Sequence, residues 1–110
     1  MILIVGGSYQ GKTEYAKQNF SNHNIWNGLH LFVKEKLEKN FSEEQILDEI
    51  HKKTDEGHWV LISDELGNGI VPIDEKDTQW REVTGRILIL LAKEADEVYR
   101  VLLGMGQRIK

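Results

Sequence analysis

Two hydrophobic patterns alternate along the chain. Uninterrupted runs of apolar, β-branched residues are typical of buried strands, whereas apolar residues at every third or fourth position are typical of amphipathic helices. On this basis, strands are predicted at residues 2–5, 25–26, 59–62, 97–103 and 107–110. Helices are predicted at residues 12–20, 29–39, 43–54 and 77–95.

The order of these elements defines the expected fold. Strands that alternate with helices indicate an α/β fold with a mostly parallel sheet covered on both faces. A loop is predicted at residues 66–72, which hold two glycines and the only proline, and a turn at residues 104–106. A chain of 110 residues, 40% of them hydrophobic, is expected to form one compact domain, residues 1–110, in three layers.

Composition argues against several functions. The formal net charge is -4 and the basic residues are scattered, which argues against nucleic acid as the main partner. Without cysteine, the chain forms no disulfide, zinc–thiolate site or thiol nucleophile. The apolar runs are too short for a signal sequence or a membrane span, so no membrane partner is expected. A cytoplasmic location fits these features.

The segment between the first strand and the first helix matches the phosphate-binding motif G-x-x-x-x-G-K-[ST] at every fixed position. Glycines in such a loop let backbone N–H groups point at the β-phosphate, and the helix N-terminus faces the same anion. Lys12 is expected to reach the β- and γ-phosphates, and the Thr13 hydroxyl to ligate Mg²⁺. The motif does not distinguish ATP from GTP. The predicted nucleotide-binding residues are Gly6, Gly7, Ser8, Tyr9, Gln10, Gly11, Lys12 and Thr13.

A chance match is the competing interpretation of this motif, but the strand before it and the helix after it favour a nucleotide site. Such a site needs a carboxylate at the end of a neighbouring strand to hold the metal or its water. The predicted strand at residues 59–62 leads into Asp64 and Glu65. Asp64 is favoured as the metal ligand and Glu65 as a base or second ligand. Alternatively, both are solvated residues at a strand end.

Two stretches of the chain together resemble one family. Residues 1–13 (MILIVGGSYQGKT) are similar to the opening of the adenosylcobinamide kinase/adenosylcobinamide-phosphate guanylyltransferases. Residues 64–72 (DELGNGIVP) and 80–110 resemble that family's ending, with its Gly-x-Gly-Ile-Val-Pro motif and its Gly-x-Gly hairpin. The resemblance implies a P-loop NTPase-like fold, a homo-oligomer, and phosphoryl transfer from ATP or GTP to a cobinamide-type hydroxyl in cobalamin biosynthesis.

One departure from the family concerns its second activity. Members are longer, and the part absent here follows the first helix and carries the His that becomes guanylylated. Ile50-His51-Lys52 resembles the family's Ile-x-His-His-Lys, but the nucleophilic His falls on Ile50. His51 is expected to be a solvated helix residue, and the other histidines have no stronger claim. Guanylyl transfer is therefore expected to be lost.

Other departures alter polar residues. The family's Asp at the end of another strand corresponds to Asn27 here, whereas the family's Asn before the Gly-x-Gly motif is Asp64. One carboxylate is lost and one gained, so a rearranged metal site is expected. Leu88 and Ile89 stand where the family has Asn-Gln, so core-like residues replace polar contacts there.

Three functions stay open on the sequence. In a compact kinase, Lys12 and Mg²⁺ would stabilise charge during transfer and Glu65 would orient the acceptor hydroxyl. The second is a nucleotide-binding or slowly NTP-hydrolysing protein without a corrinoid substrate. The third is a structural partner that retains an unused loop. The intact Gly-Lys-Thr sequence and Asp64 favour the first two.

Overall fold

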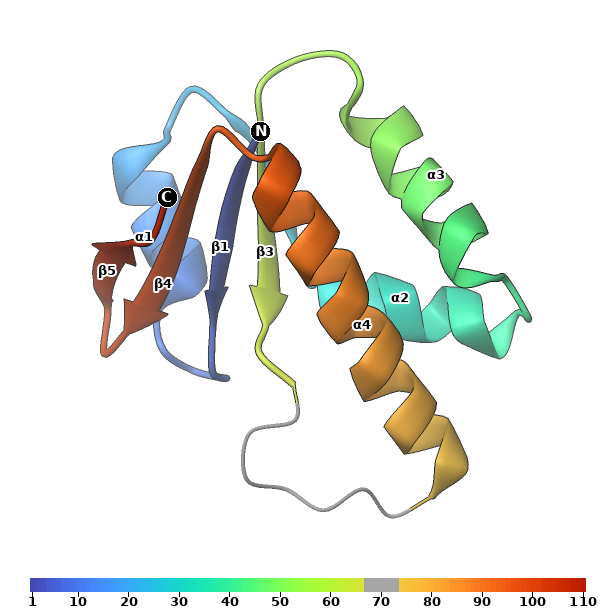
Figure 1. Ribbon diagram of the computed structural model, residues 1–110. Coiled ribbons are helices and arrows are strands. Elements are labelled where there is room, and N and C mark those ends of the chain that lie inside the picture. Colours follow the sequence, from blue (N-terminus) through green and yellow to red (C-terminus); the bar gives the residue numbers. More distant parts are fainter. Residues whose placement is uncertain (67–73) are drawn as a thin grey trace.

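The computed structural model describes residues 1–66 and 74–110 as an α/β fold (Figure 1). Its strands are β1 (Ile2–Gly6), β2 (Asn24–Asn27), β3 (Trp59–Asp64), β4 (Glu97–Leu102) and β5 (Met105–Arg108). Its helices are α1 (Lys12–Asn19), α2 (Leu29–Glu38), α3 (Glu43–Thr54) and α4 (Glu75–Glu94). The sheet has the order β2-β3-β1-β4-β5, in which β5 alone runs antiparallel to its neighbour. The predicted α/β fold is confirmed.

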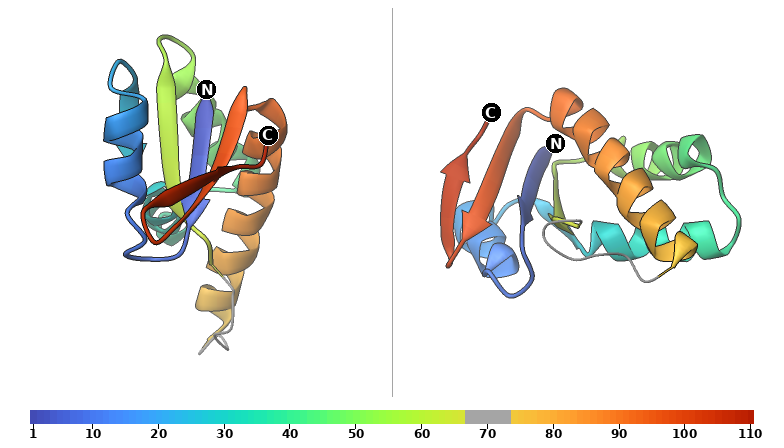
Figure 2. Two further views of the ribbon diagram at one scale, coloured as in Figure 1. Left: turned by 90° about the vertical axis from the view of Figure 1, so that its left-hand side faces the viewer. Right: turned by 60° about the horizontal axis from the view of Figure 1, so that its bottom comes forward.

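The sheet is covered on both faces, with α1 on one side and α2, α3 and α4 on the other (Figure 2). Side chains of β1 alternate between the two resulting cores because successive residues of a strand point to opposite faces. Leu3 packs in the core under α2, α3 and α4, whereas Ile2 and Ile4 pack in the smaller core under α1. The predicted three layers are thus two helical layers around one sheet.

Several predicted boundaries move by a few residues. α4 begins at Glu75, earlier than predicted, because the Asp74 side chain caps it by accepting a hydrogen bond from the Asp77 N–H at 2.7 Å. The last strand also begins earlier, at Met105, because the hairpin turns at Leu103 and Gly104, where φ is 52° and 76°. The predicted loop at residues 66–72 lies, after Leu66, outside the described residues, as does most of the Gly-x-Gly-Ile-Val-Pro motif.

The two residues of α4 that were predicted to replace family amides, Leu88 and Ile89, differ in environment. Leu88 packs against the larger core, as expected, but Ile89 is 58% exposed. The expectation of core-like residues is therefore confirmed for Leu88 and wrong for Ile89, because the helical rotation between neighbours turns Ile89 away from the sheet. No helix among the residues described is both long and apolar enough to cross a membrane.

Gly6 and Gly85 differ in the space around them, so alanine at each position tests how closely β1 packs against β4. A Cβ atom on Gly6 would lie 2.5 Å from the backbone oxygen of Val101 in β4, whereas one on Gly85 would meet nothing within 4 Å. We expect Gly6→Ala to lower the free energy of unfolding by about 1–3 kcal/mol through overpacking. Gly85→Ala should raise it by about 0.5–1 kcal/mol, because glycine is unfavourable inside a helix. Urea denaturation measures both, and equal stabilities would contradict this account of Gly6.

Candidate functional site

The loop of residues 6–13 lies at the edge of the sheet where the parallel strands end (Figure 1). Gly6, the last residue of β1, stands opposite Asp64, the last residue of β3. The loop passes through left-handed backbone at Tyr9 (φ 59°) and at Gly11 (φ 85°), directly before α1. Gly11 has no side chain to cap α1, which leaves the first N–H groups of this helix to another acceptor.

Lys12, the first residue of α1, is buried and makes two contacts at this edge. Its Nζ donates to the Gly7 backbone oxygen at 2.5 Å and lies 2.8 Å from Asp64 Oδ1. The second carboxylate oxygen of Asp64 accepts a hydrogen bond from Ser8 Oγ at 2.7 Å. The predicted phosphate-binding lysine and the predicted metal-binding carboxylate are therefore in direct contact.

The charge state of Asp64 follows from these neighbours. Burial alone would raise the pKa of Asp64, but the hydrogen bonds from Lys12 and Ser8, with the nearby His30 and Lys12 charges, hold it below its ordinary value. Asp64 is consequently ionised at neutral pH, and its charge is matched by the ammonium of Lys12.

His30 is a residue of this site that the sequence did not reveal. It lies at the start of α2, just after β2 ends at this edge, and its side chain is only 11% exposed. Its Nδ1 accepts a hydrogen bond from the Asp64 backbone N–H at 3.1 Å, and its Nε2 lies 3.4 Å from Asp64 Oδ2. Burial lowers the pKa of His30, while the charge of Asp64 acts in the opposite direction. The net shift of this pKa is downward, which favours the neutral imidazole. Its position shortly after the predicted strand at residues 25–26 was the one feature of the sequence that could have indicated a place in this site.

These side chains surround an open hollow of about 380 Å³. Most of the predicted site residues line it, but Gly6 and Gly7 do not, and neither does Glu65. Its carboxylate instead accepts a hydrogen bond from Arg100 of β4 at 3.1 Å, and its backbone N–H donates to Gly6. The residues that line the hollow are Ser8, Tyr9, Gln10, Gly11, Lys12, Thr13, Glu14, Asn27, Gly28, His30, Leu31 and Asp64.

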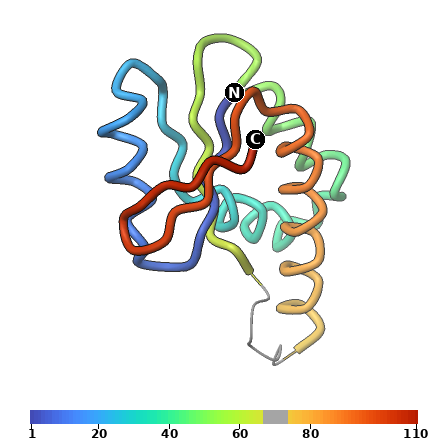
Figure 3. Tube along the Cα trace, turned by 60° about the vertical axis from the view of Figure 1, so that its left-hand side comes forward, coloured from blue at the N-terminus to red at the C-terminus, as the bar shows by residue number. Residues whose placement is uncertain are grey.

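Gln10 connects the loop to the C-terminal hairpin. Its side-chain oxygen accepts a hydrogen bond from the Leu103 N–H at 2.8 Å, and its backbone oxygen accepts one from the Gly104 N–H at 2.7 Å. The hairpin lies beside the loop in Figure 3. Gln10 was predicted to bind nucleotide from its place in the motif. In the structure, its side chain holds the hairpin against the loop.

The oxygen donors of the site fit Mg²⁺. Thr13 and Asp64 line the same hollow, and hydroxyl and carboxylate oxygens are ligands of the kind that Mg²⁺ binds. Asp64 already faces one positive charge, the Lys12 ammonium. Within residues 1–66 and 74–110, no three His, Asp or Glu side chains form a closed metal cage. Such a sparse donor set suits an ion held largely by nucleotide phosphates and water.

His51 lies away from this edge. It stands near the end of α3, from which the chain enters β3 at its opposite, amino end. Its Nε2 lies 2.8 Å from Glu94 Oε2 of α4, and its side chain is 43% exposed. Ile50, which was predicted to take the place of the family's nucleophilic His, is fully buried in the larger core. His51 is therefore partly solvated, as predicted, and also forms an interhelical contact.

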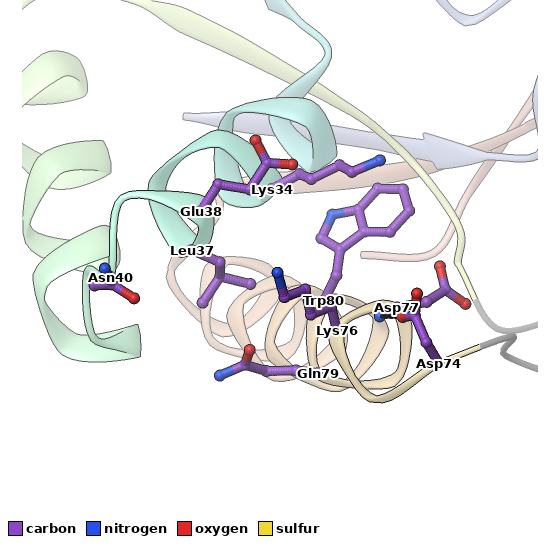
Figure 4. Close-up of a pocket in the computed structure, with 9 residues that line it drawn as sticks. All are labelled: Lys34, Leu37, Glu38, Asn40, Asp74, Lys76, Asp77, Gln79 and Trp80. Carbon is purple, nitrogen blue, oxygen red and sulfur yellow. Dashed lines mark hydrogen bonds between the residues drawn. The ribbon is translucent and has the colours of Figure 1, made fainter.

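A second hollow, of about 510 Å³, lies between α2 and α4 (Figure 4). Trp80 and Lys34 form part of its wall, with the Lys34 ammonium 4.9 Å from the centre of the Trp80 ring. The Trp80 ring also stacks on His30, with 6.4 Å between ring centres, and its Nε1 donates to the His30 backbone oxygen at 2.8 Å. Trp80 thus connects this hollow to the edge that carries the loop of residues 6–13.

The sheet, its helical layers and the loop at the carboxyl edge define an α/β protein with a P-loop NTPase-like fold. Comparison with known proteins specifies the group. Residues 24–109 match the family described as "CobU: Cobinamide kinase / cobinamide phosphate guanyltransferase". This match covers well over half of the chain, and the chain belongs to that family.

Two curated proteins are similar to part of the chain. The "Bifunctional adenosylcobalamin biosynthesis protein CobU" of Salmonella typhimurium (strain LT2) is 43% identical over 51 residues. The protein of the same name from Escherichia coli (strain K12) is 41% identical over 51 residues. Each match covers 46% of this chain and 28% of the relative. The predicted family is confirmed, while the loop at residues 6–13 precedes the family match and is supported by its own motif and geometry.

Proposed function

We propose that this chain binds ATP or GTP with Mg²⁺ at the loop of residues 6–13 and transfers a phosphoryl group to a hydroxyl of a cobinamide-type corrinoid. The observation that carries the proposal is the pairing of Lys12 with Asp64 in a hollow at the N-terminus of α1. Membership of the cobinamide kinase family supports the acceptor class. The two relatives are named for adenosylcobalamin biosynthesis, which supports the same pathway.

Each residue of the hollow has a task in this proposal. The backbone N–H groups of the loop and of the first turn of α1 bind phosphate oxygens. Lys12 leaves Asp64 and contacts the β- and γ-phosphates, where its charge stabilises the transferred group. Thr13 and Asp64 would hold Mg²⁺, directly or through water. When bound, this ion neutralises charge that develops on the phosphate oxygens.

Glu65 is proposed to orient the acceptor hydroxyl. It follows β3 directly, and its backbone N–H donates to Gly6 at 2.8 Å, so it lies at the same edge as the loop. Its carboxylate is bound to Arg100 at 3.1 Å, and Arg100 is 52% exposed. The Glu65 side chain is 23% exposed, so an acceptor hydroxyl can approach it from solvent at this edge.

The alternative is a nucleotide-binding or slowly NTP-hydrolysing protein without a corrinoid substrate. The described residues leave the hollow open, which favours this alternative, because a kinase has to exclude water from the transferred phosphoryl group. In the kinase proposal, a neighbouring subunit of a homo-oligomer supplies the missing wall.

Calorimetric titration with ATP and with GTP, each with Mg²⁺, tests the binding step and selects the base. Repetition with cobinamide present, followed by chromatography for phosphorylated cobinamide, tests the transfer step. Nucleotide binding with corrinoid phosphorylation supports the kinase. Nucleotide binding without phosphorylation at any corrinoid concentration supports the alternative, and the absence of nucleotide binding contradicts both.

We also expect that the protein forms no covalent guanylyl intermediate. The reason is that Ile50 takes the place of the nucleophilic His and is buried, while His51 is held by Glu94 away from the phosphate-binding edge. Incubation with α-labelled GTP followed by denaturing electrophoresis should show no labelled protein. A stable, acid-labile label that disappears in His51→Ala would contradict this prediction. Lys52→Ala, which changes an exposed neighbour, serves as the control.

A further inference from the structure

We propose that His30 is a positioning residue that holds the Asp64 carboxylate in place when the nucleotide draws Lys12 away. The inference rests on the proposed function, because it concerns the state in which nucleotide occupies the loop. It assigns a task to a residue outside the phosphate-binding motif, in the first turn of α2.

The imidazole of His30 contacts Asp64 at two points. Its Nδ1 accepts from the Asp64 backbone N–H at 3.1 Å, and its Nε2 lies 3.4 Å from Asp64 Oδ2. A ring nitrogen that accepts from an amide carries no proton, so in the neutral imidazole the proton is on Nε2. The nitrogen that carries the proton is therefore the one that lies 3.4 Å from the carboxylate. The same tautomer makes Nε2 unsuited to act as a nucleophile.

Asp64 depends on these contacts more strongly once nucleotide binds. Three groups now lie near its carboxylate: the Lys12 ammonium at 2.8 Å, the Ser8 hydroxyl at 2.7 Å and His30 Nε2 at 3.4 Å. Phosphates compete for Lys12, and Ser8 belongs to the loop that closes around them. His30 is the one of these three that lies outside the loop. It can therefore keep the carboxylate oriented while the loop rearranges.

The surroundings of His30 are suited to this task because they fix the ring. Trp80 of α4 stacks on the imidazole with an angle of 27° between the rings, and its Nε1 donates to the His30 backbone oxygen at 2.8 Å. Lys34 lies over the Trp80 ring at 4.9 Å, as Figure 4 illustrates. A side chain held by packing and hydrogen bonds positions its partner more accurately than a mobile one.

Two substitutions separate the contacts of His30. In His30→Asn the side-chain oxygen can replace Nδ1 and accept from the Asp64 N–H, but nothing replaces Nε2. In His30→Gln the amide nitrogen can reach the Nε2 position and donate to the carboxylate, but nothing replaces Nδ1. A role in orienting the carboxylate predicts that Gln rescues function, whereas a role confined to holding the backbone of β3 predicts that Asn does.

The measurement is the gain in nucleotide affinity that Mg²⁺ provides. Calorimetry with a non-hydrolysable ATP analogue gives this gain as the ratio of the affinity in Mg²⁺ to the affinity in EDTA. We expect this gain to fall about tenfold in His30→Asn and to stay within about threefold of the native value in His30→Gln, as for loss of one hydrogen bond to a charged group. In steady-state assays, His30→Asn should lower kcat with little change in the KM for the acceptor. The same substitutions at the exposed His58 serve as controls.

An unchanged Mg²⁺-dependent gain in His30→Asn would overturn the inference, as would a rescue by Asn instead of Gln. If His30→Asn does not fold, Trp80→Phe is used in its place. This change removes the hydrogen-bond donor to the His30 backbone oxygen and should also lower the Mg²⁺-dependent gain in affinity. A native gain in Trp80→Phe also overturns the inference. Failure of the proposed function gives a different result. In that case the native protein itself shows no Mg²⁺-dependent nucleotide binding, which overturns both.

Discussion

Lys12→Ala should weaken the binding of nucleoside triphosphate by about one to two decades, because a charge-assisted contact of this kind contributes roughly 1.5–3 kcal/mol. Lys12 provides the side-chain positive charge of the loop, and the hollow that it lines also contains Asp64, which repels phosphate. Without Lys12 the repulsion is unopposed. Calorimetry with ATP and with GTP measures the loss.

The structure adds a condition to this experiment. Lys12 is only 7% exposed and its ammonium is paired with Asp64, so the substitution also removes a partner from a partly buried carboxylate. The melting temperature and circular dichroism of the variant should therefore be recorded beside its affinity. Lys17→Ala is the matched control, because Lys17 lies on the same helix, is 61% exposed and pairs only loosely with Glu14. Native affinity in a folded Lys12→Ala variant would contradict the proposed nucleotide site.

Much of the fold could be predicted because its elements have local signatures. Ile2, Leu3 and Ile4 form an uninterrupted apolar run since the strand they belong to is buried on both faces, between two helical layers. Ser42 and Gln45 have the spacing of a capping box at the start of α3, and both hydrogen bonds of that box are present. Such signatures lie within a few residues and do not depend on tertiary structure.

The contacts that complete the site could not be predicted in the same way. The hydrogen bond between His30 and the Asp64 backbone joins residues 34 positions apart, and that between Gln10 and Leu103 joins residues 93 positions apart. The sequence around these residues does not indicate which strands become neighbours in the sheet. Only the observed strand order, with β3 between β2 and β1, brings His30, Asp64 and Lys12 to one edge.

The same strand order gives a physical meaning to the predicted exchange of polar residues relative to the family. Asn27 ends β2 and Asp64 ends β3, and these two strands are adjacent. Both residues line the hollow that Lys12 also lines. If a carboxylate was lost at Asn27 and gained at Asp64, as the resemblance implies, it stayed within one site. The hypothesis that the acid has moved is compatible with this geometry, and it makes a direct prediction about metal dependence.

Asp64→Asn should reduce the gain in nucleotide affinity that Mg²⁺ provides by about tenfold or more, since it removes the carboxylate proposed to bind the ion or its water. In EDTA, the same variant should bind nucleotide at least as tightly as the native protein. The reason is that Lys12 and Ser8 no longer have to leave a carboxylate before they meet the phosphates. Opposite effects with and without metal distinguish a metal ligand from a residue that merely supports the fold.

Glu65→Gln provides the contrast that makes this test specific. Glu65 is the next residue along the chain, but its carboxylate is bound to Arg100 rather than to Lys12. If it orients the acceptor hydroxyl, its substitution should lower kcat while leaving nucleotide affinity and its Mg²⁺ dependence close to native. Arg100→Gln controls for the loss of the ion pair alone and should leave kcat close to native. If instead Asp64→Asn leaves the Mg²⁺ dependence unchanged, Asp64 serves only as the partner of Lys12, and the binding protein without phosphoryl transfer becomes the better description of the chain.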